Sequence, residues 1–98
     1  MKFSQKVWNL CRKIPKGRVS TYKLIAKKLK TKAYRAVGNA LNKNPYAPVV
    51  PCHRVVKSDG QIGGFARGTA KKIELLKKEN IKIEKNKIAG FEKVLFTP

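Results

Sequence analysis

The sequence predicts a small, mostly α-helical single domain with a helix-turn-helix of the winged-helix-like type. Three observations lead to this fold class. The chain has 98 residues, which is room for one domain. Its first 42 residues hold three stretches in which apolar side chains recur at helical spacing. A short basic turn separates the second stretch from the third, as in a helix-turn-helix. Since no repeat, linker or Pro/Gly-rich boundary divides the chain, we expect one domain over residues 1–98.

The first helix is expected over residues 3–14, ended by Pro15 to Gly17. Its apolar face includes Cys11, which we interpret as a small buried hydrophobic residue. Ser20 or Thr21 can cap a second helix, which runs to about Leu29.

The third helix is expected from Ala33 to Asn42, before the breaker Asn44-Pro45. One of its faces is polar and has little bulk, and it consists of Arg35, Gly38, Asn39 and Asn42. Such a face can approach DNA closely in a groove, or it can simply be a solvated helix face. The basic residues around it favour the groove.

Residues 47–51 are apolar and rich in proline, so we expect an extended, buried segment before Cys52-His53-Arg54 and Val55-Val56. A glycine-rich loop follows over residues 60–68. Thr69 is expected to cap a fourth helix that ends near Glu79–Asn80, and residues 81–88 favour a short C-terminal hairpin.

The charge is strongly asymmetric. Lys and Arg number 24 against 5 Asp and Glu, for a net charge of +19, and the acids all lie at or after Asp59. This distribution predicts an anionic partner, with nucleic acid favoured over an acidic membrane surface. The chain has no apolar run of membrane-spanning length and no signal-peptide pattern, so we expect a cytoplasmic protein. Two cysteines and one histidine do not make an ordinary structural zinc site, and we expect no metal, no cofactor and no Cys11–Cys52 disulfide.

Pro51-Cys52-His53-Arg54-Val55 is the sharpest motif. A thiol acts as a nucleophile in its thiolate form, which an adjacent basic or cationic group favours. Adjacent side chains rarely touch, so His53 would act on Cys52 through a bridging water. The alternative is a structural cysteine beside a hydrogen-bonded histidine.

The fourth helix favours the chemical interpretation. Lys72 and Glu79 project from its apolar arc, where charged groups need partners. Glu79 could orient His53 and complete a Cys–water–His–Glu relay. A contact between Lys72 and Glu79 within the helix is the alternative, across two turns.

These motifs resemble the O6-alkylguanine-DNA alkyltransferases. The resemblance rests on Pro51-Cys52-His53-Arg54-Val55, on Arg35-Ala36-Val37-Gly38 before it and on Gly63-Gly64-Phe65 after it, in the family's order. It covers about residues 3–80, and residues 81–98 form a tail whose role it does not indicate.

The resemblance implies irreversible transfer of an alkyl group from O6 of guanine, less readily from O4 of thymine, to the cysteine sulfur. One protein molecule is consumed per lesion. It implies that Cys52 is the acceptor, His53 the base and Glu79 the acid that holds His53. Tyr22 would bind the flipped base and, with Lys72, stabilise the departing guanine. Asn44 would pack between the DNA-binding element and the cysteine segment.

The same resemblance implies monomeric binding to duplex DNA through the minor groove, without sequence specificity. The nucleotide would rotate out of the stack, and Arg35 would fill its place. The other DNA contacts expected are Gly38, Asn39, Tyr22 and Arg54. The substrate pocket would comprise Val55, Gly64, Phe65 and Ala66, with backbone carbonyls near Cys52 and Val55 reading the exocyclic amine.

The sequence also departs from the family's pattern. Many relatives have an additional N-terminal domain, whereas the catalytic-type domain begins here almost at Met1, so we expect it to be absent. Ala66 stands where some relatives have a hydroxyl residue, so a backbone N–H would donate to O6 instead, with weaker or altered selectivity. Gly64 replaces bulkier residues, which predicts a pocket open to larger alkyl groups. Two other functions stay open: a non-catalytic alkyltransferase-like protein that binds lesions, and a basic helix-turn-helix or architectural DNA-binding protein. Cys52 favours the enzyme over the first, since those proteins typically lack the cysteine.

Overall fold

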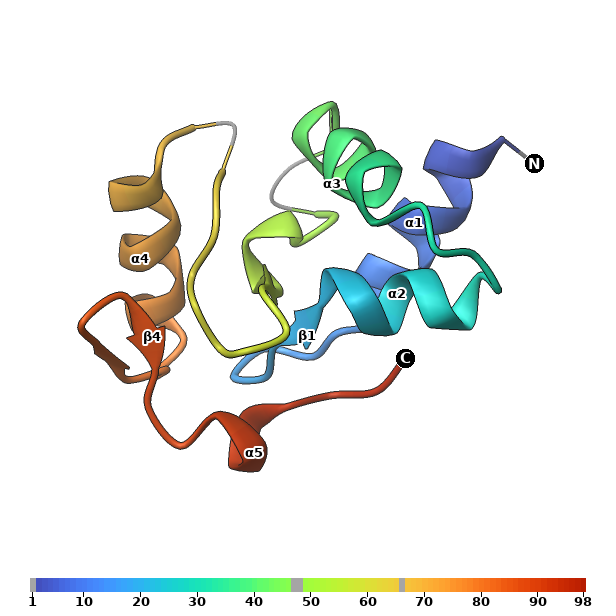
Figure 1. The fold of residues 1–98 in the computed structure, drawn as a ribbon. Coiled ribbons are helices and arrows are strands. Elements are labelled where there is room, and N and C mark those ends of the chain that lie inside the picture. The colour runs from blue at the N-terminus through green and yellow to red at the C-terminus, as the bar shows by residue number, and fades with distance from the viewer. Residues whose placement is uncertain (1, 47–48, 66) are drawn as a thin grey trace.

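Three helices form the N-terminal part of the molecule: α1 (Phe3–Arg12), α2 (Tyr22–Lys28) and α3 (Tyr34–Asn42) (Figure 1). The computed structural model describes residues 2–46, 49–65 and 67–98. Helix α1 packs against α2 and α3, and the three together bury a first core, which includes Val7, Ile25 and Val37. The predicted small, mostly α-helical fold is confirmed.

Helix α1 ends at Arg12, earlier than the sequence predicts, although Ile14 is still buried. The physical reason is Pro15, because the residue before a proline is disfavoured in helical conformation. Helix α2 begins as expected after Thr21, whose side-chain oxygen accepts a hydrogen bond from the Leu24 amide at 3.0 Å.

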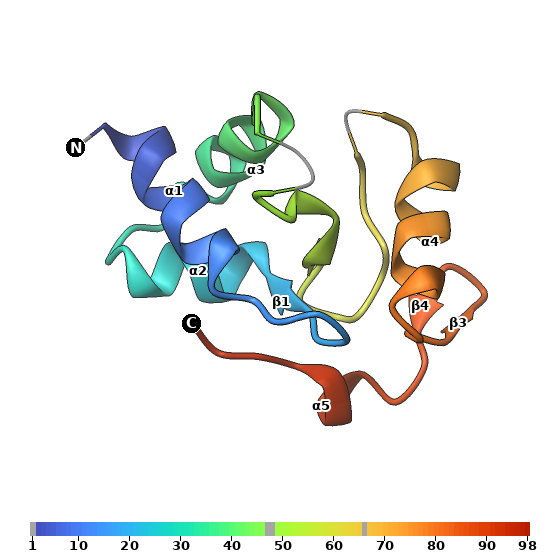
Figure 2. The same ribbon diagram turned by 180° about the vertical axis from the view of Figure 1, so that it is seen from behind.

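The cysteine segment lies between the three-helix part and the C-terminal part (Figures 1 and 2). It consists of a single 3₁₀ turn, η1 (Cys52–Arg54), and a two-residue strand, β2 (Val55–Val56). Strand β2 pairs in parallel with β1 (Ser20–Thr21), the two residues just before α2. This pairing was not predicted, because strands of two residues have no readable periodicity. It fixes the start of α2 beside the cysteine turn.

The extended segment before the turn is only partly as expected. Val50 is fully buried, but Val49 is 72% exposed, and Ala47 and Pro48 lie outside the described residues. Val50 is held by two backbone hydrogen bonds: its amide donates to the Tyr46 carbonyl, and its carbonyl accepts from the Asn44 side chain.

The C-terminal part contains α4 (Thr69–Lys78), the hairpin strands β3 (Ile83–Glu84) and β4 (Lys87–Ile88), and α5 (Phe91–Val94). Gly68, not Thr69, is the N-cap of α4, and its φ of 93° lies where glycine is favoured over other residues. The predicted hairpin is confirmed, with antiparallel strands joined through Lys85 and Asn86 at φ 49° and 62°.

The tail completes a second core. Leu95 forms a parallel bridge with Val19, and the amide of Phe96 donates to the Val19 carbonyl at 2.7 Å. Ile88 from the hairpin is buried in the same cluster as Val19, Val56 and Leu76. The tail therefore supports the segment that leads into β1 and α2. No helix in the described ranges is long and apolar enough to cross a membrane.

Candidate active site

Cys52 opens the 3₁₀ turn and is 8% exposed, at the boundary of the first core. The turn is closed by a hydrogen bond from the Arg54 amide to the Pro51 carbonyl at 2.9 Å. The turn therefore places three consecutive side chains at the site, and two of them, His53 and Arg54, share the partner Glu79.

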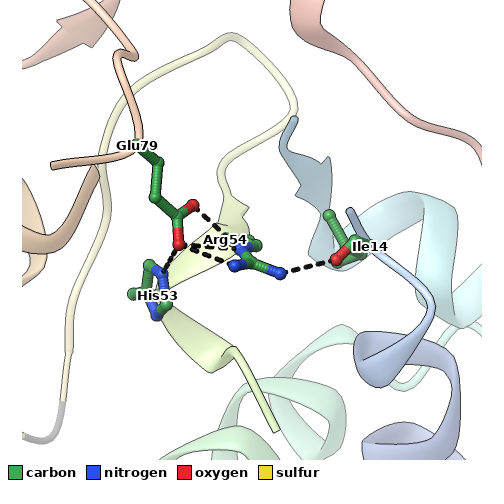
Figure 3. Close-up of polar contacts among 4 residues, drawn as sticks. All are labelled: Ile14, His53, Arg54 and Glu79. Atoms are coloured by element: carbon green, nitrogen blue, oxygen red, sulfur yellow. Dashed lines mark hydrogen bonds and ion pairs between the residues drawn. The ribbon is translucent and has the colours of Figure 1, made fainter. Parts of the chain in front are cut away.

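His53 and Arg54 both meet Glu79, which is the C-cap residue of α4 (Figure 3). His53 Nε2 lies 3.0 Å from Glu79 Oε2. The Arg54 guanidinium donates to the same carboxylate through Nη2 at 2.7 Å and through Nε at 2.9 Å. It also donates through Nη1 to the Ile14 carbonyl at 2.8 Å, just beyond the end of α1. Arg54 thus joins α1, the cysteine turn and α4.

This network sets the charge state of the histidine and the carboxylate. Burial lowers the pKa of His53, and the hydrogen bond with Glu79 opposes that change without cancelling it. Burial would by itself raise the pKa of Glu79, but the hydrogen bonds from Arg54 and His53 hold it below its ordinary value. The pair at neutral pH is therefore a neutral imidazole against a carboxylate. Such an imidazole can accept a proton, and the carboxylate stabilises the resulting cation.

Lys72 is fully buried, and its ammonium lies among three oxygen atoms. Nζ donates to the Val55 carbonyl at 2.7 Å, to the Gly64 carbonyl at 3.1 Å and to the Tyr22 hydroxyl at 3.4 Å. An ammonium has three protons, so each acceptor takes one. Lys72 therefore connects the strand after the cysteine, the glycine-rich loop and the start of α2.

Burial also shifts the pKa values of this second group. It lowers the pKa of Lys72 to about 8 and raises that of the Tyr22 phenol. Lys72 stays mainly protonated at pH 7, and Tyr22 stays neutral. Because the Tyr22 oxygen accepts from Lys72, its own proton can point toward another acceptor.

Asn44 connects the end of α3 to the cysteine segment. Its Nδ2 donates to the Val50 carbonyl at 2.8 Å, and its Oδ1 accepts from the Tyr46 amide at 2.9 Å. The chain from Val50 to Cys52 continues with a hydrogen bond from the Cys52 amide to the Val50 carbonyl. A displacement of α3 would thus be transmitted directly to the turn that holds the cysteine.

The polar face of α3 is open. Arg35 and Asn39 are exposed, and a Cβ added at Gly38 would meet no atom within 4 Å. The opposite face, with Val37, Ala40 and Leu41, is buried in the first core. The exposed face of α3 is therefore a surface of small side chains with one cation, Arg35. Asn44 connects this same helix to the segment that holds Cys52.

Comparison with known proteins assigns this arrangement to a family. Residues 2–81 match the family model described as "6-O-methylguanine DNA methyltransferase, DNA binding domain". The chain belongs to this family.

Curated members of the family match at about half identity. The methylated-DNA–protein-cysteine methyltransferase of Sulfolobus acidocaldarius is 49% identical over 82 residues, which are 84% of this chain and 52% of that protein. The protein of the same name from Methanosarcina barkeri is 50% identical over 78 residues, 79% of this chain and 49% of that protein. The chain thus spans about half the length of these relatives.

Two solved structures show the same fold. Mycobacterium tuberculosis OGT in complex with DNA is 40% identical with a TM-score of 0.77, over 81% of this chain and 50% of that one. S. pombe Atl1 in complex with damaged DNA containing O6-carboxymethylguanine is 28% identical with a TM-score of 0.86, over the whole of both chains.

In this alkyltransferase-family domain, the side chains predicted from sequence form two groups. His53 and Glu79 are in contact, as the relay requires, and Tyr22 meets Lys72. Lys72 and Glu79 do not pair within α4, because each has partners on other elements. No hydrogen bond joins the described side chains of Cys52 and His53, because the His53 ring faces Glu79 instead.

The pocket residues are distributed unevenly. Val55 is buried and offers its carbonyl to Lys72, whereas Gly64 is exposed and does the same. Phe65 packs against the first core, and Ala66 lies outside the described residues.

Arg54 has a structural role that the sequence does not reveal. Its guanidinium is bonded to Glu79 and Ile14, with the side chain 16% exposed, and the expected DNA contact stays a prediction. Sequence reasoning missed this role because Arg54 is 25 residues from Glu79 in sequence. The available signal was that Glu79, near an apolar face, requires a cation.

Cys11 is a second thiol in the first core and is completely buried. Burial, and secondly the nearby Cys52, raise the pKa of Cys11 to about 12. It is therefore a neutral thiol at physiological pH. Among the described residues, no group of His, Cys, Asp or Glu could hold a metal ion.

Proposed function

We propose that this domain repairs DNA by transferring a methyl or other alkyl group from O6 of guanine, and less readily from O4 of thymine, to Cys52. The transfer is irreversible, so each molecule acts once. The observation that carries the proposal is the His53–Glu79 pair at 3.0 Å directly beside Cys52, in a chain similar to methylated-DNA–protein-cysteine methyltransferases. A histidine polarised by a carboxylate is the base that activation of a neighbouring thiol requires.

The reaction is a displacement at a saturated carbon. His53 uses Nε2 toward Glu79, which leaves Nδ1 to take the Cys52 proton through a bridging water. The sulfur then forms a bond to the alkyl carbon as the carbon–O6 bond breaks. The electron pair of the broken bond stays on the guanine, which leaves as an anion. The polarisable thiolate suits this attack.

Tyr22 and Lys72 stabilise the leaving guanine. Because the Tyr22 oxygen accepts from Lys72 Nζ at 3.4 Å, the phenol proton is directed toward the base. Lys72 acts through Tyr22 and by holding the carbonyls of Val55 and Gly64 in place.

Duplex DNA is engaged by the exposed face of α3, with Gly38 and Asn39 close to the minor groove. Arg35 occupies the position vacated by the rotated nucleotide and so offsets part of the unstacking cost, which is a few kcal/mol. Phosphate contacts from lysines supply most of the affinity, without sequence specificity, and one monomer acts per lesion.

The decisive experiment measures intact protein mass after incubation with duplex DNA that contains O6-methylguanine. One methyl increment is expected, with none for Cys52→Ala and none on undamaged DNA of the same sequence. Repeated addition of lesion DNA should give no second increment. An unmodified wild-type protein under conditions where it binds the lesion would overturn the proposal.

A non-catalytic lesion-binding protein is the second candidate. It is favoured by the match to S. pombe Atl1, which covers the whole of both chains and was solved with DNA containing O6-carboxymethylguanine. It predicts preferential binding to O6-alkylguanine without a mass change. Binding that ignores both the lesion and Cys52→Ser would instead indicate an architectural DNA-binding protein.

A further inference from the structure

Two adjoining cavities form one groove along α2. The first, of about 480 Å³, lies between the start of α2, the start of α3 and the turn after β2, and Lys23 and Lys57 line it. The second, of about 290 Å³, continues along α2 to the turn before α3, where Lys27, Lys30 and Lys32 line it. Lys23 and Tyr34 line both cavities. We call this continuous surface the lysine groove.

The lysine groove has a strongly positive field. Its described lining includes five lysines against a single acid, Asp59. The Asp59 carboxylate already accepts a hydrogen bond from the Gln61 amide at 3.0 Å. The remaining acids lie elsewhere, at Glu74, Glu79, Glu84 and Glu92, in or next to α4, the hairpin and α5. A row of ammonium groups with little counter-charge fits a polyanion.

One end of the groove meets the reaction centre. Tyr22 lines the first cavity, and its hydroxyl is the one that contacts Lys72 Nζ. Lys72 in turn holds the Val55 and Gly64 carbonyls. A nucleotide whose base reaches Tyr22 stays covalently attached to its own strand. The phosphates beside that nucleotide must therefore lie near the mouth of the first cavity.

From this continuity we propose that the lysine groove binds the phosphates of the damaged strand next to the rotated nucleotide. The proposal rests on the proposed function, and it adds which strand is held and by which surface. The exposed face of α3 then occupies the minor groove, while Lys23, Lys27, Lys30 and Lys32 neutralise the backbone that leads to the lesion. The lysines supply affinity, and the connection to Tyr22 supplies the choice of strand.

The first experiment measures duplex binding as a function of salt for two variants of equal net charge. The groove variant is K23Q/K27Q/K30Q/K32Q. The control is K77Q/K82Q/K85Q/K87Q, whose lysines are exposed on α4 and the hairpin. Each lost phosphate contact reduces the magnitude of the negative slope of log K against log salt by about 0.9. The slope should therefore decrease in magnitude by about 3 to 4 for the groove variant and by less than about 1 for the control. Equal losses would overturn the proposal.

The second experiment tests the strand. Neutral methylphosphonates replace the phosphates flanking O6-methylguanine on the damaged strand, or the phosphates opposite it on the complementary strand. The damaged-strand replacement should weaken wild-type binding about tenfold or more and leave the groove variant nearly unaffected. If wild type and variant lose the same factor, the damaged strand does not lie in the groove.

Reaction with free O6-benzylguanine, which has no phosphate, separates this proposal from the proposed function. The groove variant should react with the free base at the wild-type rate, provided that its circular dichroism is native. If neither the wild type nor the groove variant is alkylated, the proposed function fails. The salt dependence of DNA binding still tests whether the lysine groove binds phosphates.

Discussion

Replacing Arg54 by alanine removes the side chain that joins three elements at the candidate site. Glu79 would lose the donors at 2.7 and 2.9 Å, and the Ile14 carbonyl would lose its donor at 2.8 Å. The carboxylate, which is 10% exposed in the wild type, would keep only His53 as its partner. A charge would thus be left largely out of water without its main counter-charge.

The expected cost follows from these burials. Breaking a fully buried ion pair costs about 3–5 kcal/mol. The Arg54 side chain is 16% exposed, so we expect a smaller cost, about 2–3 kcal/mol at pH 7. For a domain of this size each kcal/mol lowers the melting temperature by about 4–8 °C, which predicts a fall of about 10–20 °C.

The stability lost in Arg54→Ala should be larger at neutral pH than at low pH. In the wild type the pKa of Glu79 is held below its ordinary 4.5, so its ion pair contributes stability above that pH and loses it as pH falls through the folded-state pKa. Without Arg54, burial is opposed by His53 alone, and the pKa of Glu79 rises. The difference in unfolding free energy between wild type and variant should therefore shrink at low pH, where Glu79 becomes protonated in both proteins.

The assay is urea unfolding at a series of pH values, with Arg18→Ala as the control. Arg18 also donates two hydrogen bonds to carbonyls, those of Val94 and Leu95, but at an exposed position without a carboxylate. Its loss should cost about 1 kcal/mol or less, without the same pH dependence. Arg54→Lys should restore only part of the stability, because an ammonium lacks the fork that reaches Glu79 and Ile14 together. Equal costs for Arg54→Ala and Arg18→Ala would refute this reasoning.

Three other substitutions test separate parts of the site. Burial lowers the pKa of Lys72 from 10.5 to about 8, so the unfolded chain binds this proton more tightly than the folded one. Between pH 8 and 10.5, the unfolding free energy of the wild type should therefore rise by about 3 kcal/mol relative to that of Lys72→Met, as measured by urea unfolding. A constant difference between the two proteins would contradict the buried ammonium. Arg35→Ala should slow methyl transfer from duplex DNA far more than reaction with free O6-benzylguanine, in rates followed by protein mass, and equal losses would remove its role in the duplex. Cys11→Ala should leave the single methyl increment unchanged, because a thiol with a pKa of about 12 is neutral at pH 7, and loss of the increment in a folded variant would show that Cys11 takes part.

Much of the fold could be predicted because its signals are local. The apolar spacing of α1 to α3, the Thr21 cap and the hairpin turn at Lys85–Asn86 each depend on neighbouring residues. The errors have local causes as well. Pro15 shortens α1, and the positive φ of Gly68 moves the cap of α4 by one residue.

The sequence by itself determined the residue types that can perform the chemistry: Cys52, the adjacent His53, and the carboxylate of Glu79 near the end of the predicted fourth helix. It also placed 15 of the 24 basic residues before the first acid, Asp59, which indicated an anionic partner. Those properties belong to residue identity and spacing, which are fully contained in the chain.

Only the tertiary structure decided which partners these residues take. Arg54 turns inward because α4 brings Glu79 to the cysteine turn and α1 brings the Ile14 carbonyl. Lys72 meets Tyr22 across 50 positions of sequence, since β1 and β2 pair in parallel. Contacts between distant segments are set by packing the two cores, and no local pattern of residues encodes them.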